Sequence, residues 1–274
     1  MAITTQAQLA DALDKGTKQR FTFTKTGVST NTGSSSSCWR GTGINPAQGA
    51  IPTTAVACSN ATVGAIPFIN PVSGQSTYMA KWSVLSSVVG SVELHDRLCH
   101  MGGLDSTLTT TQTVNLSLFS MLGTNNLTTR MGKADYSEVQ WWIEIYSALG
   151  TTTAPTLTIA FTDQNGAAQT TTYTLTSSTV SATRALPIIP PAGLFIRSIE
   201  SVTLSSSTGT AGNFGFTATV ERAGMALPLI NHVHDFAVGP IFVPIPDSAC
   251  LNYVFNATGT TGPTIGGSIT FVQG

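Results

Sequence analysis

The stretch Tyr136–Thr176, YSEVQWWIEIYSALGTTTAPTLTIAFTDQNGAAQTTTYTLT, decides the fold class of this chain. In its first part, apolar and more polar positions alternate. The odd positions hold Val139, Trp141, Ile143 and Ile145, and the even positions hold Gln140, Trp142, Glu144 and Tyr146. Successive side chains of an extended chain leave opposite faces, so a period of two predicts a strand. Its β-branched and aromatic residues favour the same structure.

A second run, Thr156–Thr162, alternates in the same way, with apolar residues separated by Thr158 and Ala160. Asp163–Gly166 follows, and its Asn-Gly dipeptide readily adopts positive φ, which predicts a turn. Beyond the turn the apolar pattern continues at Tyr173 and Leu175. The whole stretch predicts an antiparallel meander with one apolar face and one Thr-rich, solvated face.

A short helix is expected near the N-terminus, over Ala7–Lys15. Thr5 can cap it, and Gly16 can end it. Leu9, Ala10 and Leu13 form one apolar stripe. Such a helix serves either as an arm that contacts another subunit or as a cover for a sheet edge. We therefore divide the chain into an N-terminal arm, residues 1–20, and a single β-domain, residues 21–274.

The least regular segment spans residues 27–63, which is too long for an ordinary connection. A loop of this size predicts an interaction surface, an Ω-loop or disorder. Trp39 and Ile51 indicate that part of it packs against something.

Three further segments carry local expectations. Ser91–Cys99 is expected to be a strand end or a single helical turn, which Gly102-Gly103 then breaks. Asn125-Asn126 predicts a turn. Leu186–Phe195 holds three prolines, so we expect an extended connection rather than an interior strand.

The fold class predicted by these patterns is all-β. About ten short strands are expected, with no alternating βα pattern and no fixed repeat. We predict an antiparallel β-sandwich or a jelly-roll-like arrangement with a short N-terminal helix and long loops.

Charged residues make up only 9% of the 274 residues, against about 25% in ordinary soluble domains. Twelve basic and thirteen acidic residues give a net charge of −1, so we expect no attraction to nucleic acid. Copies of such a chain repel one another weakly, which favours a homo-oligomer. No apolar run approaches the roughly 20 residues that span a bilayer, and we expect no membrane partner.

The four cysteines, Cys38, Cys58, Cys99 and Cys250, are widely spaced and form no CxxC pair, which disfavours a zinc site. Cys38 and Cys58 could bridge a loop. The N-terminus, however, lacks the basic and apolar regions of a secretory signal, which favours reduced, buried thiols and synthesis in a cytoplasm.

His232-Val233-His234-Asp235 is the sharpest metal-like cluster. His232 and His234 share one face of a strand, and two imidazoles at this spacing can chelate a divalent ion. A third ligand would have to come from elsewhere; the candidates are His100, Asp247 and Glu221. The simpler interpretation is a polar edge strand whose histidines bond backbone or water. We expect no metal and no cofactor.

No nucleophilic site is expected. Cys99 and His100 are adjacent, so in a strand they point to opposite faces and cannot pair directly. His95-Asp96 supplies no oriented third member. The chain also lacks a G-x-S-x-G motif, a P-loop and a dinucleotide fingerprint.

Glycoside hydrolysis would need two carboxylates that face each other across a cleft. The acidic side chains show no convergent pattern; the candidates are Glu138, Glu144, Asp163, Glu200 and Glu221. For Glu200 and Glu221 we expect cross-strand ion pairs with Arg197 and Arg222.

Trp141-Trp142 places two indoles on opposite faces of one strand. One should enter the core, and the other should be exposed unless something covers it. On a surface of such low charge, an exposed indole favours a protein interface over a sugar-stacking platform.

Two passages resemble virion structural proteins of tailed bacteriophages: Leu94–Thr113, LHDRLCHMGGLDSTLTTTQT, and Phe195–Ala223, FIRSIESVTLSSSTGTAGNFGFTATVERA. The resemblance implies a non-enzymatic protein that is present in many copies in the particle and is built from β-rich modules. It also implies a location in the virion, and the missing secretory signal favours synthesis in the host cytoplasm.

We accordingly expect a capsid-associated decoration or minor head protein that contacts copies of itself and other virion proteins such as the major capsid protein. The predicted contact residues are Leu9, Leu13, Trp39, Ile44, and one of Trp141 or Trp142. The alternatives are a tail or connector component, or a carbohydrate- or receptor-binding virion module that uses Trp or Tyr platforms.

Overall fold

The computed structural model describes the chain except for residues 1, 178 and 238–242, and the side chains of residues 124–127 and 236–237. The described helices are α1 (Gln6–Lys15), α2 (Leu118–Leu122) and α3 (Thr124–Met131), with a 3-10 turn at Cys38–Arg40. The described strands are β1 (Lys18–Thr26), β2 (Ser35–Ser37), β3 (Thr42–Ile44), β4 (Val56–Ala57), β5 (Thr77–Ser86), β6 (Gly90–Asp105), β7 (Gln112–Ser117), β8 (Gln140–Ser147), β9 (Thr156–Asp163), β10 (Ala168–Thr174), β11 (Arg184–Pro187), β12 (Ile196–Leu204), β13 (Asn213–Leu227), β14 (His234–Ala237), β15 (Leu251–Ala257) and β16 (Ile265–Gln273).

These strands form three antiparallel sheets, so the predicted all-β, antiparallel class is confirmed. The strand orders are β14-β5-β16-β1-β3, β10-β9-β12-β7 and β13-β8-β11-β2-β15-β6-β4. In the last sheet β13 also pairs with β6. That pairing closes six strands into a barrel, and β4 pairs with β6 at Cys99 and His100, beyond the residues of β6 that pair with β15.

The barrel has its apolar side chains on the outside. Along β15, Leu251, Tyr253 and Phe255 join an apolar core, whereas Asn252 and Val254 line the barrel interior. Strand alternation produces this split, because neighbouring residues leave opposite faces.

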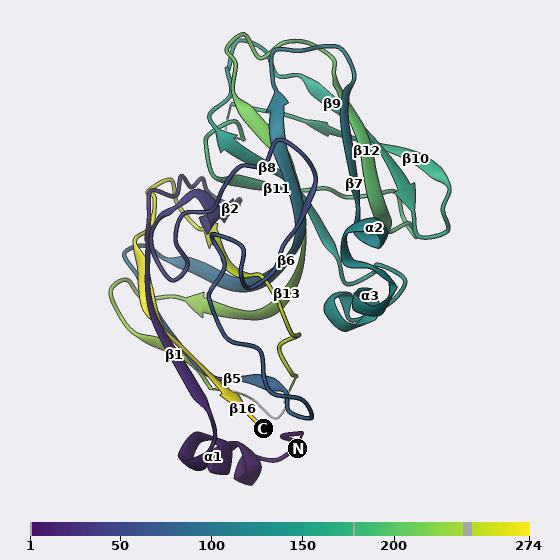
Figure 1. Cartoon of the computed structure of the whole chain (residues 1–274). Helices are drawn as coiled ribbons and strands as arrows, with labels where there is room; N and C mark the ends of the chain where they lie inside the picture. The colour runs from purple at the N-terminus through teal and green to yellow at the C-terminus, as the bar shows by residue number, and fades with distance from the viewer. Residues whose placement is uncertain (1, 178, 238–242) are drawn as a thin grey trace.

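Two hydrophobic cores cover opposite parts of the barrel's outer surface. One joins barrel residues such as Ile143 and Phe216 to Ile159 and Val202 of the β10-β9-β12-β7 sheet. The other joins Leu94 and its neighbours to the five-stranded sheet. Figure 1 shows this order in space, with the four-stranded sheet at the top right, the barrel in the middle and β1, β5 and β16 below.

The N-terminal helix forms where it was predicted. The Thr5 side chain accepts a hydrogen bond from the Gln8 backbone N–H, the Gln8 side chain bonds back to Thr5, and Gly16 is the C-cap. Leu9 and Leu13 are half-buried against a small cluster that includes Tyr78 and Val272. The helix therefore packs on its own chain, at the end of β16 in Figure 1.

The β9–β10 hairpin is confirmed, with the Asp163 carboxylate accepting hydrogen bonds from the backbone N–H groups of Asn165 and Ala167 in the turn. The expected three-stranded meander is wrong, because β8 lies in the barrel between β13 and β11. The segment after β8 turns away from β9, and the Leu149 N–H bonds the carbonyl of Val180. A period of two identifies a strand but does not choose its partner.

Ser91–Cys99 is neither a strand end nor a helical turn. It belongs to β6, a 16-residue strand that continues through Gly102-Gly103. A Cβ on Gly102 would lie 2.6 Å from Ile51 Cγ2 and 2.8 Å from Tyr146 Cε2, so this glycine permits close packing and does not break the strand.

Two other local expectations need correction. Asn125-Asn126 lies within α3 and is not a turn. The expected connection over Leu186–Phe195 is present from residue 188 to residue 195, but Leu186 and Pro187 end β11, which lies between β8 and β2 inside a sheet. Proline fits there because it is the last residue of the strand, where a missing N–H costs no interior ladder bond.

None of the helices in the described part of the chain is long and apolar enough to cross a membrane.

Candidate functional site

The barrel interior holds a column of buried polar and aromatic side chains contributed by five strands. They are Ser37, His95, Arg97, His100, Trp142, Glu144, Tyr146, Thr217, Thr219 and Asn252. Each stands on the face of its strand opposite the apolar cores, which is why the same alternation that builds the cores fills the barrel with polar groups.

A buried ion pair lies at the centre of this column. Arg97 donates from Nη1 and Nη2 to the two carboxylate oxygens of Glu144, at 2.7 and 2.8 Å. Thr217 Oγ1 also donates to Glu144 at 2.6 Å, and Arg97 Nη2 donates to Ser37 Oγ at 3.3 Å. Burial opposes ionisation of Glu144, but the Arg97 guanidinium outweighs it and lowers the pKa of Glu144 to about 2.

A second buried charge network lies on the outer side of β6. Asp96 accepts from Arg130 at 2.5 Å and from Arg222 at 3.0 Å. Arg130 also donates to the carbonyl of Cys58 at 2.6 Å. Because Arg130 is on α3 and Arg222 on β13, this network attaches the helix to the barrel wall.

Asn252 lies in the interior without a hydrogen-bonding partner for its amide in the described part of the chain, and the same holds for Arg97 Nε. Both residues line a cavity of about 10 Å³ between Trp142, Thr217 and Thr219. A cavity of this size and polarity accommodates about one water molecule. The middle of the barrel is therefore closed to larger ligands.

Trp39 closes one end of the barrel. Its ring lies 4.1 Å from the guanidinium carbon of Arg97 and 5.1 Å, edge-on, from the ring of His100. Its indole Nε1 donates to the carbonyl of Ala50 at 2.7 Å. Trp39 is fully buried, so its predicted role in contacting another subunit is wrong: part of the expected long loop folds back and inserts this side chain as a plug.

Two thiols lie beside this plug. Cys58 and Cys250 share a small buried cluster with Trp39 and Tyr146. Burial raises the pKa of Cys58, but contacts with Cys250, His100 and Arg97 outweigh it, so the pKa of this thiol is lowered. Cys38 belongs to a different core, and all four cysteines are free and buried. A Cys38–Cys58 bridge is therefore not formed here.

The other end of the barrel opens to solvent through a pocket of about 400 Å³. Its lining includes Glu93, Glu138 and Glu221, with His95 and Trp142 at the barrel side and no lysine or arginine among the described lining residues. Burial opposes ionisation of Glu93, but bonds from His95 and Asn256 outweigh it and lower the pKa of Glu93. The pocket can therefore hold a polar or cationic group beside a largely buried indole.

Hydrogen bonds fix the rings at the bottom of this pocket. His95 Nε2 lies 2.9 Å from Glu93 Oε2, and His95 Nδ1 lies 3.0 Å from Thr219 Oγ1. Trp142 Nε1 donates to the same hydroxyl at 2.8 Å. The two rings, 6.0 Å apart and edge-on, thus share one threonine.

The two tryptophans of β8 occupy opposite faces, as predicted, but neither is exposed. Trp141 is 2% exposed and donates from Nε1 to the carbonyl of Ile196 at 2.9 Å. Trp142 is 7% exposed and faces the barrel interior. The predicted subunit contact through one of them is therefore wrong, because the barrel interior encloses Trp142 and the four-stranded sheet covers Trp141 on the outer face of the strand.

The remaining predicted contact residues are accessible. Ile44, in the short edge strand β3, is 56% exposed, and Leu9 and Leu13 are half-buried. Their part in an interface stays a prediction.

The predicted histidine cluster lies at a sheet edge. His232 is exposed, and His234 Nε2 lies 3.2 Å from the carbonyl of Leu229. Asp235, the next residue, bonds Ser83 and pairs with Lys81 at 3.6 Å. The described residues hold no group of three His, Cys, Asp or Glu side chains arranged for a metal ion.

The other acid–base candidates are dispersed. Cys99 faces an apolar core and His100 the barrel interior, so the two point to opposite faces as predicted. The expected ion pairs of Glu200 and Glu221 with Arg197 and Arg222 are wrong. The Glu200 carboxylate accepts from the hydroxyls of Thr162 and Ser198, and Arg222 pairs with Asp96.

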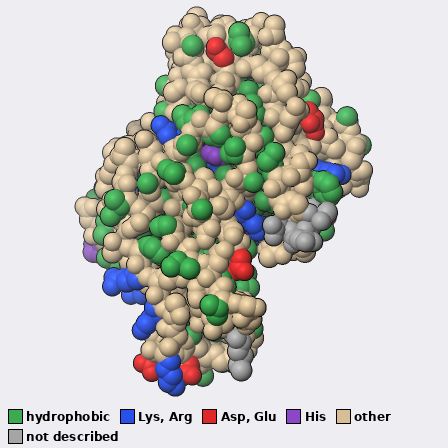
Figure 2. Space-filling model, in the orientation of Figure 1, with side chains coloured by type: hydrophobic (Ala, Val, Ile, Leu, Met, Phe, Trp, Pro, Cys, Tyr) green, Lys and Arg blue, Asp and Glu red, His purple; other side chains and the backbone are tan. Residues whose placement is uncertain are grey.

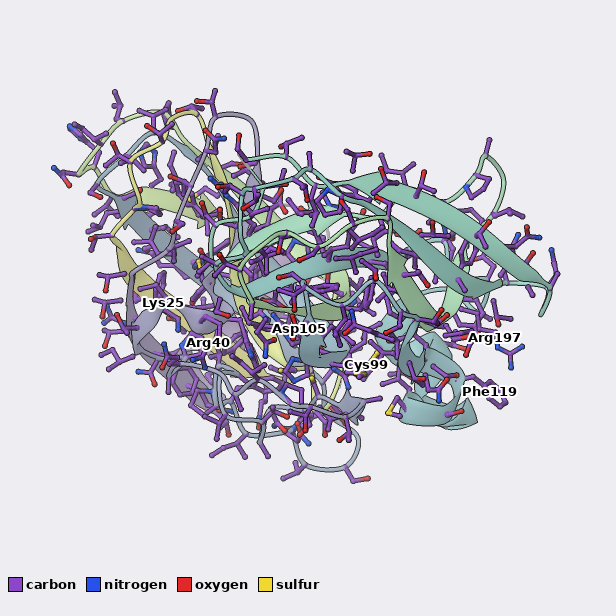
Figure 3. The ribbon with its side chains drawn as sticks, turned by 90° about the horizontal axis from the view of Figure 1, so that it is seen from above. Lys25, Arg40, Cys99, Asp105, Phe119 and Arg197 are labelled. Atoms are coloured by element: carbon purple, nitrogen blue, oxygen red, sulfur yellow. The ribbon has the colours of Figure 1, made fainter. Side chains whose placement is uncertain are left out.

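Arg197 has a different partner from the one expected. Its guanidinium carbon lies 4.7 Å from the centre of the Phe119 ring, and the two side chains lie close together in Figure 3. The contact joins β12 to α2.

Sequence reasoning did not single out Arg97 or Glu93. It considered Glu144 and His95 only as catalytic candidates and did not place them at the centre and mouth of a barrel. A signal was present in SVELHDRLC, where Glu93, His95 and Arg97 share one parity and Val92 and Leu94 share the other. A strand with one apolar and one charged parity is ordinarily assigned to a solvated sheet face. The charged face of this strand becomes buried only because the sheet closes into a barrel around it.

Comparison with known proteins gives no match, whether with protein-family models, with curated proteins or with solved structures.

Proposed function

We propose that this chain is a virion structural protein of a tailed bacteriophage, most simply a capsid-associated decoration or minor head protein that acts through repeated contacts with its own copies and with other virion proteins. In this proposal the outer sheets and barrel form a jelly-roll-like sandwich unit. The observation that carries it is the distribution of charge between the inside and the outside of the molecule.

Seven of the 25 charged side chains are buried. They are Lys25, Asp96, Arg97, Arg130, Glu144, Asp163 and Arg184. What remains outside is dominated by uncharged side chains, and Figure 2 shows mostly tan and green atoms on the face it draws, with isolated charged groups and one gathering of them at the lower end. A surface with so few charges gives little electrostatic repulsion between copies.

The outside also carries large apolar side chains. Ile69 is 71% exposed, Val72 67%, Ile189 77% and Val233 63%. Fully covering one such side chain stabilises an interface by about 1.5–3 kcal/mol before the costs of association. Contacts of this kind, repeated over many copies in a shell, support a mechanical role.

The decisive experiment locates the chain in the particle. Purified virions of the phage that encodes it are analysed by mass spectrometry and by electron microscopy. We expect many copies per particle at symmetric positions on the head. Absence of the chain from purified virions would contradict the proposal, and a ring at the neck or tail would replace the head assignment by the tail or connector alternative.

A second candidate is a carbohydrate- or receptor-binding virion module. The open barrel mouth favours it, because its carboxylates and amide can bond hydroxyl groups beside Trp142. Truncation of Trp142 would disturb the barrel, so the sharper variant is Glu221→Gln, which changes an open pocket wall. Glycan-array binding that this variant abolishes would favour the second candidate; an array with no binding to either protein would count against it.

A further inference from the structure

The ends of the three sheets differ in how they are protected against pairing with another chain. In the five-stranded sheet, β3 has three residues, and β14 has four that include His234 and Asp235. β4, at the end of the barrel sheet, has two. Short or charged edge strands are the usual protection against edge-to-edge association.

The four-stranded sheet has one protected and one unprotected edge. β7 pairs with β12 across a register shift, and its Asn115 has φ +50°, so this edge is irregular. β10 is seven residues long, AQTTTYT, and pairs with β9 in unbroken register over its whole length. It contains no charge, no proline and no bulge.

The far side of β10 presents a row of backbone groups to solvent. An edge strand leaves alternate N–H and C=O groups unpaired, and these groups are satisfied best by another strand. Side chains along β10 alternate between exposed and half-buried, so the outer face of the strand is solvated while Tyr173 packs against the core below. Figure 1 places β10 at the outer right margin of the molecule, away from the other two sheets.

A separate observation points to the same edge. Ile189, at 77% the most exposed large apolar side chain in the described chain, lies beside β10, because its carbonyl accepts from Thr171 Oγ1 at 3.0 Å. An exposed isoleucine next to an unprotected strand edge is what a neighbouring chain would cover.

We propose that β10 pairs antiparallel with β10 of a second copy of this chain, about a two-fold axis near Thr171. Under this axis Thr170 lies opposite Thr172 of the other copy, and Ala168 lies opposite Thr174. Cross-strand threonine pairs are favourable and no like charges meet, so the strand is complementary to itself. This inference rests on the proposed function and identifies one of its subunit contacts.

The test uses charge complementation in the full-length chain. The variant Thr170→Lys/Thr172→Lys places lysines opposite lysines in the pair, and Thr170→Glu/Thr172→Glu places glutamates opposite glutamates. Each variant alone should self-associate at least roughly tenfold more weakly than wild type in sedimentation equilibrium. An equimolar mixture of the two should recover an affinity within about threefold of wild type, because opposite charges then meet.

The matched control is Thr158→Lys, which adds a lysine to the same sheet face one strand inward, directly opposite Thr172 in the β9–β10 register. It should leave association unchanged. Circular dichroism confirms that each variant is folded. Association of the lysine variant at wild-type strength would overturn the inference, and so would a mixture that fails to recover.

Failure of the β10 contact can be distinguished from failure of the proposed function. A wild-type chain that stays monomeric up to millimolar concentration would overturn the β10 pairing. The same chain found in purified virions would leave the proposed function standing with another interface, whereas its absence from virions would remove the proposed function itself.

Discussion

At the scale of single residues, the chain places a fully buried arginine and glutamate at the centre of its barrel. Removing one partner of such a pair leaves an uncompensated charge in a desolvated site, which is far more costly than losing the pair as a unit. Arg97 also lies against Trp39 and donates to Thr217. We therefore regard the pair as the feature that sets the arrangement of the interior.

Substituting Glu144→Gln should lower the free energy of unfolding by about 3 kcal/mol or more, because Arg97 keeps its charge and loses its counter-ion. Urea denaturation measures the change. The control is Glu138→Gln, which removes the carboxylate that pairs with Lys133; both side chains are about half-exposed. This variant should lower the free energy of unfolding by less than about 1 kcal/mol. Equal losses for the two variants would contradict this account of the barrel centre.

The same carboxylate predicts a pH dependence. The pKa of Glu144 is about 2 in the folded chain, below its ordinary value of 4.5, so the stabilisation is fully present above about pH 4.5 and is lost as pH falls through about 2. The shift corresponds to stabilisation on the order of 3 kcal/mol. The difference in unfolding free energy between wild type and Glu144→Gln should therefore shrink from pH 5 to pH 2. A difference that stays constant over that range would show that Glu144 is not held ionised by Arg97.

Some of this residue-scale detail could be predicted, and some could not. The opposite faces of Trp141 and Trp142 follow from strand periodicity alone. Their burial does not, because it depends on distant segments: Trp142 is enclosed when β8 pairs with β13, and Trp141 is covered by β12. For the same reason the segment with Glu93, His95 and Arg97 was expected to be a strand end or a helical turn: the residues that enclose these side chains come from the other strands of the barrel.

At the scale of elements, two segments with strong local signals matched expectation, whereas the Asn125-Asn126 dipeptide, expected to form a turn, lies within α3. The capped helix α1 and the β9–β10 hairpin are specified by residues within a few positions of each other. Segments whose structure depends on distant partners did not match, notably β6 and the loop that carries Trp39. Local sequence signals therefore predicted individual helices and strands better than they predicted which strands pair or pack together.

The Trp39 plug gives a prediction at this scale. A Cβ on Gly49 would lie 2.1 Å from Trp39 Cε2, closer than any real contact. Gly49→Ala should therefore lower the free energy of unfolding by about 1–3 kcal/mol through overpacking, and should expose the loop to limited proteolysis. Gly259→Ala, where a Cβ meets nothing within 4 Å, should stay within about 0.5 kcal/mol of wild type. A Gly49→Ala protein as stable and as protease-resistant as this control would show that the indole is not fixed as a plug.

At the scale of the whole molecule, the polar interior and the weakly charged exterior are two consequences of one arrangement. The barrel presents apolar side chains to two flanking sheets and encloses its ionic groups. Composition alone showed that charge was scarce, but not that seven of the 25 charged side chains lay inside. The exterior is consequently poorer in charge than the sequence suggests, which strengthens the expectation that the chain associates.

The most direct test of this account is the self-association of the full-length chain as a function of concentration and salt, measured by sedimentation equilibrium at 50 mM and 1 M NaCl. Contacts between uncharged and apolar surfaces are not screened by salt, so we predict concentration-dependent association that persists undiminished at 1 M. A chain that remains monomeric at every concentration, or that associates only at low salt, would contradict it.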